Sequence, residues 1–207
     1  MKIIRYVLSL IFLMVIYLIA WPVSIDPVAW DPPLAPALEG KYAVNNYLAA
    51  VNIIHTNEAI GPEDVDVDDE GRIYGGFLDG RIIRFSPNGK NLGVFANTKG
   101  RPLGLDFDNA GNLIIADAVK GLLSADKNGA IKILATEIEG IPLKFTDDVD
   151  VGPDNMIYFS DASEKFGVHD YRADLWEHRP HGKIIRYDPS SKKLTLLLDG
   201  LYFANGV

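Results

Sequence analysis

From residue 61 onward, apolar and polar residues alternate with a period of two, which is typical of β-strands with one buried face. The segments 65–67, 105–107 and 149–151 each place an aspartate between two apolar residues. Short sequences rich in Asp, Asn, Gly or Pro follow each segment and favour tight turns. This alternation between turns predicts antiparallel hairpins and an all-β domain.

The predicted strands belong to a repeat. Corresponding segments begin at Glu63, Leu103, Asp147 and Asn205, which lie 40, 44 and 58 residues apart. A second motif, GRIIRFSP at residues 80–87, returns as GKIIRYDP at 182–189. The third repeat carries an insertion of about 18 residues before this motif. A period of about 40–45 residues with several short strands is typical of β-propeller blades.

The N-terminus carries an apolar segment. Lys2 and Arg5 precede a run from Tyr6 to Trp21 in which Ser9 is the single polar interruption. We interpret residues 1–21 as a membrane anchor or signal segment, with an uncleaved transmembrane helix favoured because small residues for cleavage are poorly placed. The basic residues predict a cytoplasmic N-terminus and a domain on the periplasmic, extracytoplasmic or lumenal side, secreted if the segment is cleaved.

A proline-rich linker joins this segment to the domain. Residues 22–40 contain five prolines and predict a stiff, extended chain. The partial propeller is expected over residues 41–207, with blades that start near residues 61, 100, 145 and 202. Within it, residues 42–54 are mildly apolar and are predicted as a strand, with a helix as the alternative.

The amino-acid composition limits the classes of molecule that the chain is expected to bind. The chain has 20 Lys and Arg against 28 Asp and Glu, so its net charge of −8 argues against nucleic acid. It has no cysteine, which excludes disulfides and thiolate chemistry. The partners we expect are therefore a small-molecule substrate and, through the N-terminal helix, a membrane; no segment indicates a protein partner.

The repeat places oxygen-bearing side chains in equivalent positions. If each repeat is one blade, Glu63, Asp147 and Asn205 face one central axis, and three such oxygens favour a hard cation, Ca²⁺ or Mg²⁺, over zinc. The alternative is that these residues cap turns at strand starts. The neighbouring Asp64 and Asp148 are weaker candidates, because Asp is also a common turn residue.

Several motifs together resemble those of the strictosidine synthase-like proteins, within a superfamily that includes gluconolactonase/regucalcin, paraoxonase and adipocyte plasma membrane-associated proteins. The resemblance covers residues 61–207, about 70% of the chain. The motifs that carry it are Gly61-Pro62-Glu63-Asp64, FTDDVDV at 145–151, IYFSD at 157–161, HRPHGKIIRYDP at 178–189 and Phe203-Ala204-Asn205-Gly206-Val207.

The resemblance implies a six-bladed β-propeller with an active site at one mouth of its channel. It implies a catalytic calcium at Glu63, Asp147 and Asn205, with Asp147 in place of the usual asparagine, and a second, structural calcium at Asp64 and Asp148. Leu103 stands where paraoxonase-like members carry a histidine. At ~43 residues per blade, six blades exceed the 147 residues after residue 60, so about the first half of a propeller is expected, from a truncated sequence.

The insertion at residues 164–181 carries Phe166, Tyr171 and Trp176. We expect these three aromatic residues either to form a lid that contacts substrate or to pack over the third blade.

Three functions follow as hypotheses. The leading one is a calcium-dependent hydrolase of the lactonase or arylesterase type. The second is a metal-independent, strictosidine synthase-like lyase that condenses an amine with an aldehyde. The third is a non-catalytic binding propeller or inactive fragment. No catalytic residue is assigned from the sequence.

Overall fold

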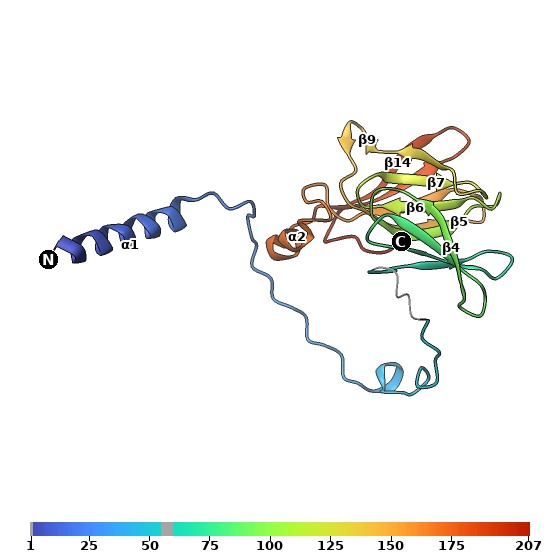
Figure 1. The fold of residues 1–207 in the computed structure, drawn as a ribbon, viewed down its shortest axis with the longest axis horizontal. Helices are drawn as coiled ribbons and strands as arrows, with labels where there is room; N and C mark the ends of the chain where they lie inside the picture. Colours follow the sequence, from blue (N-terminus) through green and yellow to red (C-terminus); the bar gives the residue numbers. More distant parts are fainter. Residues whose placement is uncertain (1, 55–59) are drawn as a thin grey trace.

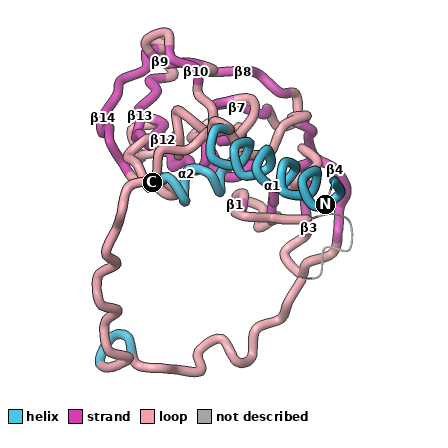
Figure 2. Tube along the Cα trace, turned by 90° about the vertical axis from the view of Figure 1, so that its left-hand side faces the viewer, coloured by secondary structure: helices cyan, strands magenta, loops and turns pink. Residues whose placement is uncertain are grey.

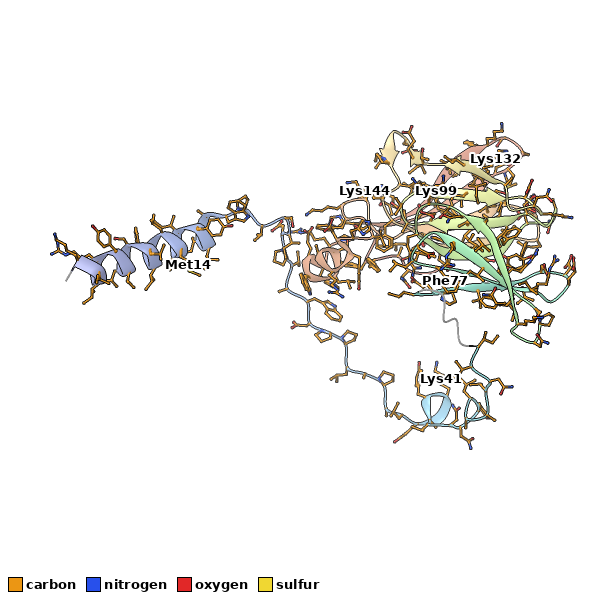
Figure 3. The ribbon with its side chains drawn as sticks, viewed as in Figure 1. Met14, Lys41, Phe77, Lys99, Lys132 and Lys144 are labelled. Carbon is orange, nitrogen blue, oxygen red and sulfur yellow. The ribbon has the colours of Figure 1, made fainter. Side chains whose placement is uncertain are left out.

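The computed structural model describes residues 2–54 and 60–207 as an N-terminal helix, a long linker and a β domain (Figure 1). Helix α1 (Lys2–Ala20) has no buried residue, and it stands apart from the β domain, so that side chains such as that of Met14 lie outside the domain (Figure 3). By length and composition it can cross a membrane: its 19 residues span roughly 28 Å. This single apolar helix is compatible with an anchor or a signal sequence.

Three four-stranded antiparallel sheets form the β domain, each with its strands in chain order (Figures 1 and 2). The first sheet contains β1 (Val65–Val67), β2 (Ile73–Gly76), β3 (Arg81–Phe85) and β4 (Asn91–Asn97). The second contains β5 (Pro102–Phe107), β6 (Leu113–Asp117), β7 (Gly121–Ala125) and β8 (Ile131–Ala135). The third contains β11 (Thr146–Val151), β12 (Ile157–Asp161), β13 (Gly182–Asp188) and β14 (Lys193–Leu201). This up-and-down order is that of propeller blades, so the all-β propeller prediction is confirmed.

Two smaller elements interrupt the sheets. A hairpin of β9 (Glu137–Ile138) and β10 (Ile141–Pro142) links the second sheet to the third. Helix α2 (Tyr171–Glu177) lies in the insertion between β12 and β13, on the side of the domain that faces α1 (Figure 1).

Aspartates directly after strands β1, β5 and β7 shape the hairpin turns. At Asp68, Asp108 and Asp126, Oδ1 accepts backbone N–H groups two and four residues later, at 2.8–3.0 Å. A side-chain acceptor at this position fixes the turn and directs the chain back along the preceding strand. The Asp-rich sequences are therefore hairpin turns.

The core lies between the sheets, and β6 is buried on both faces. Leu113 and Ile115 pack against the first sheet, whereas Ile114 and Ala116 pack against the third. This alternation is the two-residue period of a strand that is covered on both sides. Each fully buried Leu or Ile contributes roughly 1.5–3 kcal/mol.

Aspartates of the innermost strands join neighbouring sheets. In each case Oδ2 accepts a backbone N–H of the next inner segment, at 2.6–3.0 Å: Asp64 from Leu105, Asp106 from Val151, and Asp148 from Val207. Hydrogen bonds to a charged acceptor are stronger than neutral ones. These hydrogen bonds hold neighbouring inner segments in fixed relative positions.

The prediction of a strand within residues 42–54 is wrong. Residues 40–42 form a 3₁₀ helix (Gly40–Tyr42), and residues 43–54 contain turns and extended chain with every side chain exposed. Asn45 Oδ1 accepts the N–H of Tyr47, and Asn46 O accepts the N–H of Ala49. These local turns replace strand pairing, since the stretch has no period of two. Figure 2 shows the linker as an open loop beside the β domain.

Candidate functional site

The starts of the inner strands bring the expected oxygen ligands to one end of the domain. Glu63 lies two residues before β1, Asp147 lies in β11, and Asn205 lies in the segment that follows β14. Asn205 Nδ2 donates to Asp147 Oδ2 at 3.0 Å. The charge of Glu63 also acts on the Asp147 carboxyl group. The repeated position therefore places Asp147 against Asn205, and Glu63 lines the same cavity as Asn205.

Asp147 is a buried carboxyl group without a full counter-charge. Burial raises the pKa of Asp147 to about 7, and the negative charge of Glu63 adds to the rise. The hydrogen bond from Asn205 acts in the opposite direction. Desolvation and like charges both disfavour a carboxylate, and a cation nearby would relieve both effects.

A cavity of about 540 Å³ opens beside these residues. Its polar lining comes from Glu63, Lys99, Gly100, Arg101, His169, Tyr171 and Asn205. Its apolar lining comes from Leu78, Leu103, Val119, Phe145, Val168 and Phe203. The volume lies in the range of small-molecule sites, and an apolar wall with a few convergent polar groups is typical of them.

The second sheet contributes an apolar residue at the repeated position. Leu103 is buried in a cluster with Ala118, Phe145 and Ala162. Phe203 packs on this cluster, edge to face with Phe145 at a centroid distance of 5.4 Å. Leu103 therefore forms the floor of the cavity and offers no group that could transfer a proton.

Arg101 is a cavity residue that the sequence analysis did not identify. Its Nη2 lies 3.6 Å from Glu63 Oε2. The sequence signal was its place two residues before the repeated position, but a lone arginine there has no distinctive pattern. His169 was missed for the same reason, since it lies in the insertion and lines the cavity only through the fold.

Asp64 and Asp148 face the neighbouring inner strands. Both oxygens of Asp64 accept backbone N–H groups, from Val65 at 2.7 Å and from Leu105 at 2.9 Å. Asp148 Oδ2 accepts the N–H of Val207. These bonds give both carboxylates a bracing role, and the structural calcium at this pair stays a prediction.

The three aromatic residues of the insertion occupy different environments. Tyr171 lines the cavity. Phe166 is buried beneath Lys165 and packs edge-on against His181, outside the lining that the described residues form. Trp176 is 68% exposed. Tyr171 is thus the member of this set that is placed to contact a ligand.

The insertion also holds the linker. Glu177, at the end of α2, is 0% exposed and accepts the backbone N–H of Asp26 at 2.9 Å and a hydrogen bond from Lys165 Nζ at 2.8 Å. Its carbonyl oxygen accepts the N–H of Val28, and its carboxylate lies 2.9 Å from His181 Nε2. Burial raises the pKa of Glu177, but these hydrogen bonds outweigh it and lower the pKa to about 2.

This contact, which we call the linker clamp (residues 26–30 against 177–179), extends beyond Glu177. Arg179 pairs with Asp26 at 2.6 Å, and Trp30 packs against His178. No periodic sequence pattern marks these contacts. The clamp fixes α2, and α2 carries the cavity residue Tyr171.

The donors present fit a hard cation. Within residues 2–54 and 60–207, His, Cys, Asp and Glu alone form no group of three that could share a metal ion. The expected set differs from such a group because it combines two carboxylates with one amide. All its ligand atoms are oxygens, as calcium requires, and the pKa of Asp147 is raised first by burial and then by the charge of Glu63, both of which a bound cation would offset.

Two family models match the chain: "Strictosidine synthase" over residues 147–207 and "Strictosidine synthase-like, N-terminal" over residues 40–85. Strictosidine synthase-like 6 of Arabidopsis thaliana is 38% identical over 167 residues, covering 78% of this chain and 45% of the relative. Strictosidine synthase-like 4 of the same plant is 35% identical and covers 92% and 49%. The adipocyte plasma membrane-associated protein of Rattus norvegicus is 31% identical, with coverages of 88% and 53%. The chain thus spans about half the length of these relatives.

Solved structures agree with the fold. A Xanthomonas campestris gluconolactonase superimposes with a TM-score of 0.51 at 18% identity, covering 63% of this chain and 44% of the other. A second structure, also assigned to the gluconolactonases, gives a TM-score of 0.56 at 18% identity, with coverages of 69% and 50%. At these identities the likeness establishes the propeller fold.

Proposed function

We propose that this chain, which belongs to the strictosidine synthase-like family of β-propeller proteins, carries the calcium site and part of the substrate cavity of a lactone or ester hydrolase. The observation that carries the proposal is the meeting of Glu63, Asp147 and Asn205 beside a cavity of about 540 Å³. A buried carboxyl group with a raised pKa, such as that of Asp147, beside an apolar cavity is characteristic of active sites.

Each residue has a distinct part in this proposal. Glu63 and Asp147 would supply carboxylate oxygens to the ion, and Asn205 an amide oxygen. When bound, calcium would polarise a carbonyl oxygen and lower the pKa of a coordinated water. Leu103 and Phe145 would hold the apolar part of the substrate and exclude water from it. His169 and Tyr171, at the wall of the same cavity, carry an imidazole and a phenol that could donate or accept a proton.

One observation also supports a metal-independent reaction. The pKa of Asp147, raised by burial to about 7, suits a general acid–base near neutral pH. A condensation of an amine with an aldehyde needs such proton transfers and no metal ion. This lyase is the second candidate, and a binding propeller without catalysis is the third.

Location and partners form part of the proposal. We place α1 in a membrane as an uncleaved anchor, with the β domain on the extracytoplasmic or lumenal side, because Lys2 and Arg5 flank its N-terminal end. The partner of the cavity is a small molecule. Protease protection in sealed vesicles tests the topology: a digested β domain in vesicles that present the cytoplasmic side outward would contradict it.

Turnover with and without a chelator tests the chemistry. The full chain in detergent micelles would be assayed with phenyl acetate and δ-valerolactone, before and after EDTA. We expect hydrolysis that EDTA abolishes and calcium restores, and that Asp147→Ala reduces at least tenfold, because it removes the ligand oxygen. Asp199→Ala, which removes an exposed carboxylate on β14, is the matched control and should retain activity. Hydrolysis that survives EDTA would contradict the calcium mechanism, condensation of an amine with an aldehyde in EDTA would favour the lyase, and no turnover together with no calcium binding would favour a binding propeller.

A further inference from the structure

The loop between the first and second sheets presents two basic side chains to the cavity. Residues 98–101 connect β4 to β5, and Lys99, Gly100 and Arg101 all line the cavity. Lys99 adopts a left-handed conformation with φ 56°, which few non-glycine residues do. A conformation of this kind is kept where surrounding contacts fix it, as they do here.

A buried aspartate fixes this loop. Asp117, at the end of β6, is fully buried, and its Oδ1 accepts the N–H groups of Arg101, Val119 and Lys120 at 2.9–3.0 Å. Gly100 packs directly on this carboxylate: a Cβ at that position would lie 2.2 Å from Asp117 Oδ1. The loop therefore has one arrangement, and the direction of the Arg101 side chain follows from it.

The guanidinium of Arg101 has an unused donor. The side chain is 13% exposed, and Nη2 lies 3.6 Å from Glu63 Oε2. Nη1 is buried, and no hydrogen-bond acceptor in the described part of the chain pairs with it. The guanidinium is thus incompletely neutralised: one nitrogen has no acceptor, and the other is 3.6 Å from the Glu63 carboxylate, so this wall of the cavity favours an anionic ligand.

The rest of the cavity wall defines the ligand further. Leu103, Phe145 and Phe203 form an apolar floor, while Lys99 adds a second positive charge. A guanidinium presents parallel N–H groups that match the two oxygens of a carboxylate. A ligand that matches both the apolar floor and the basic side chains has an apolar skeleton and an acidic group.

We propose that Arg101, supported by Lys99, is an anion-recognition site, and that the natural ligand of this cavity is an apolar organic carboxylate. This inference rests on the proposed small-molecule site and specifies its substrate class. It does not require calcium, because Arg101 itself supplies the charge that the carboxylate meets.

Calorimetric binding of two matched probes tests the inference. The full chain in micelles of the uncharged detergent dodecyl maltoside would be titrated with 4-phenylbutyrate and with its neutral analogue 4-phenylbutyramide, both in EDTA. We expect the wild-type chain to bind the carboxylate at least tenfold more tightly than the amide. Arg101→Gln should weaken carboxylate binding about 10- to 100-fold and leave amide binding unchanged, because it removes charged hydrogen bonds.

Two further variants keep the test decisive. Lys132→Gln removes an equal charge from the exposed part of β8, which does not line the cavity, and should bind as the wild type does (Lys132 is labelled in Figure 3). Arg101→Lys retains the positive charge but lacks the parallel N–H groups of the guanidinium, so it should bind the carboxylate with intermediate affinity. If circular dichroism shows Arg101→Gln to be unfolded, Arg101→Lys takes its place in the test. Equal affinity for acid and amide, or an unchanged affinity in folded Arg101→Gln, would overturn the inference. If carboxylate binding depends on Arg101 but the chain hydrolyses neither phenyl acetate nor δ-valerolactone, the proposed hydrolase activity is wrong and the anion-recognition site is still supported.

Discussion

Replacing Glu177 with glutamine should release the linker clamp and destabilise the β domain. The fully buried carboxylate accepts hydrogen bonds from Lys165, His181 and the backbone of Asp26. Removing one member of a buried ion pair costs roughly 3–5 kcal/mol. The Lys165 side chain is 38% exposed and can turn to water, so we lower the expected loss to about 2 kcal/mol. For a domain of about 150 residues this corresponds to a fall in Tm of roughly 4–8 °C.

The pH dependence of this loss gives a second check. Because its hydrogen bonds lower the pKa of Glu177 to about 2, below the ordinary value of 4.5, its contribution is complete above pH 4.5 and disappears as the pH falls towards 2. Urea unfolding of the wild type and Glu177→Gln should therefore differ at pH 7 and converge in acid. Limited proteolysis should also cut residues 22–30 faster in the variant.

Glu139→Gln is the matched control for this experiment. Glu139 is exposed in the turn between β9 and β10, so its loss should change stability by less than about 0.5 kcal/mol. If Glu177→Gln unfolds like Glu139→Gln at pH 7, or if the linker is cut no faster, the clamp does not stabilise the fold as we describe.

Three other changes test separate parts of the structure. Burial raises the pKa of Asp147 to about 7, so the stability that its bound proton contributes is present below pH 3.8 and is lost as the pH rises through 7. Without calcium, Asp147→Asn should therefore raise the urea midpoint of unfolding at pH 8 and hardly change it at pH 4. Gly100→Ala should lower Tm and abolish 4-phenylbutyrate binding, because the added Cβ would lie 2.2 Å from a carboxylate oxygen of Asp117. Gly167→Ala, whose added Cβ would have its nearest neighbour at 3.6 Å, should do neither. Phe159→Ala, in the core between the second and third sheets, should cost about 3–5 kcal/mol in urea unfolding, and a loss below 1 kcal/mol would contradict that packing.

Local patterns in the sequence predicted the sheets and the convergence of the site. The two-residue alternation around Asp66, Asp106 and Asp150 depends on neighbours along the chain, and it correctly indicated strands. Its apolar face is not buried in β1, where Val65 and Val67 are exposed. The repeat then related Asp147 to Asn205 by symmetry, and the two side chains are hydrogen bonded. Equivalent positions of blades share one axis, so a repeat carries three-dimensional information that a single segment does not.

Features that depend on contacts between distant, unrelated segments were not predictable. The clamp joins Asp26 to residues some 150 positions later, and the side chains involved follow no period. The role of Arg101 depends on Asp117, which shapes its loop from another strand. The wrong strand prediction at 42–54 arose from apolar composition, whereas Asn45 and Asn46 favoured local turns.

Calorimetric titration of the full chain with Ca²⁺ at pH 7.5 tests the central proposal most directly. Glu63, Asp147 and Asn205 lie together at the cavity, so we expect a single site that Glu63→Gln weakens at least tenfold and that the exposed-site control Asp199→Asn leaves unchanged. Absence of calcium binding by the wild type, or equal affinity in the Glu63→Gln variant, would contradict the calcium site on which the proposed hydrolysis depends.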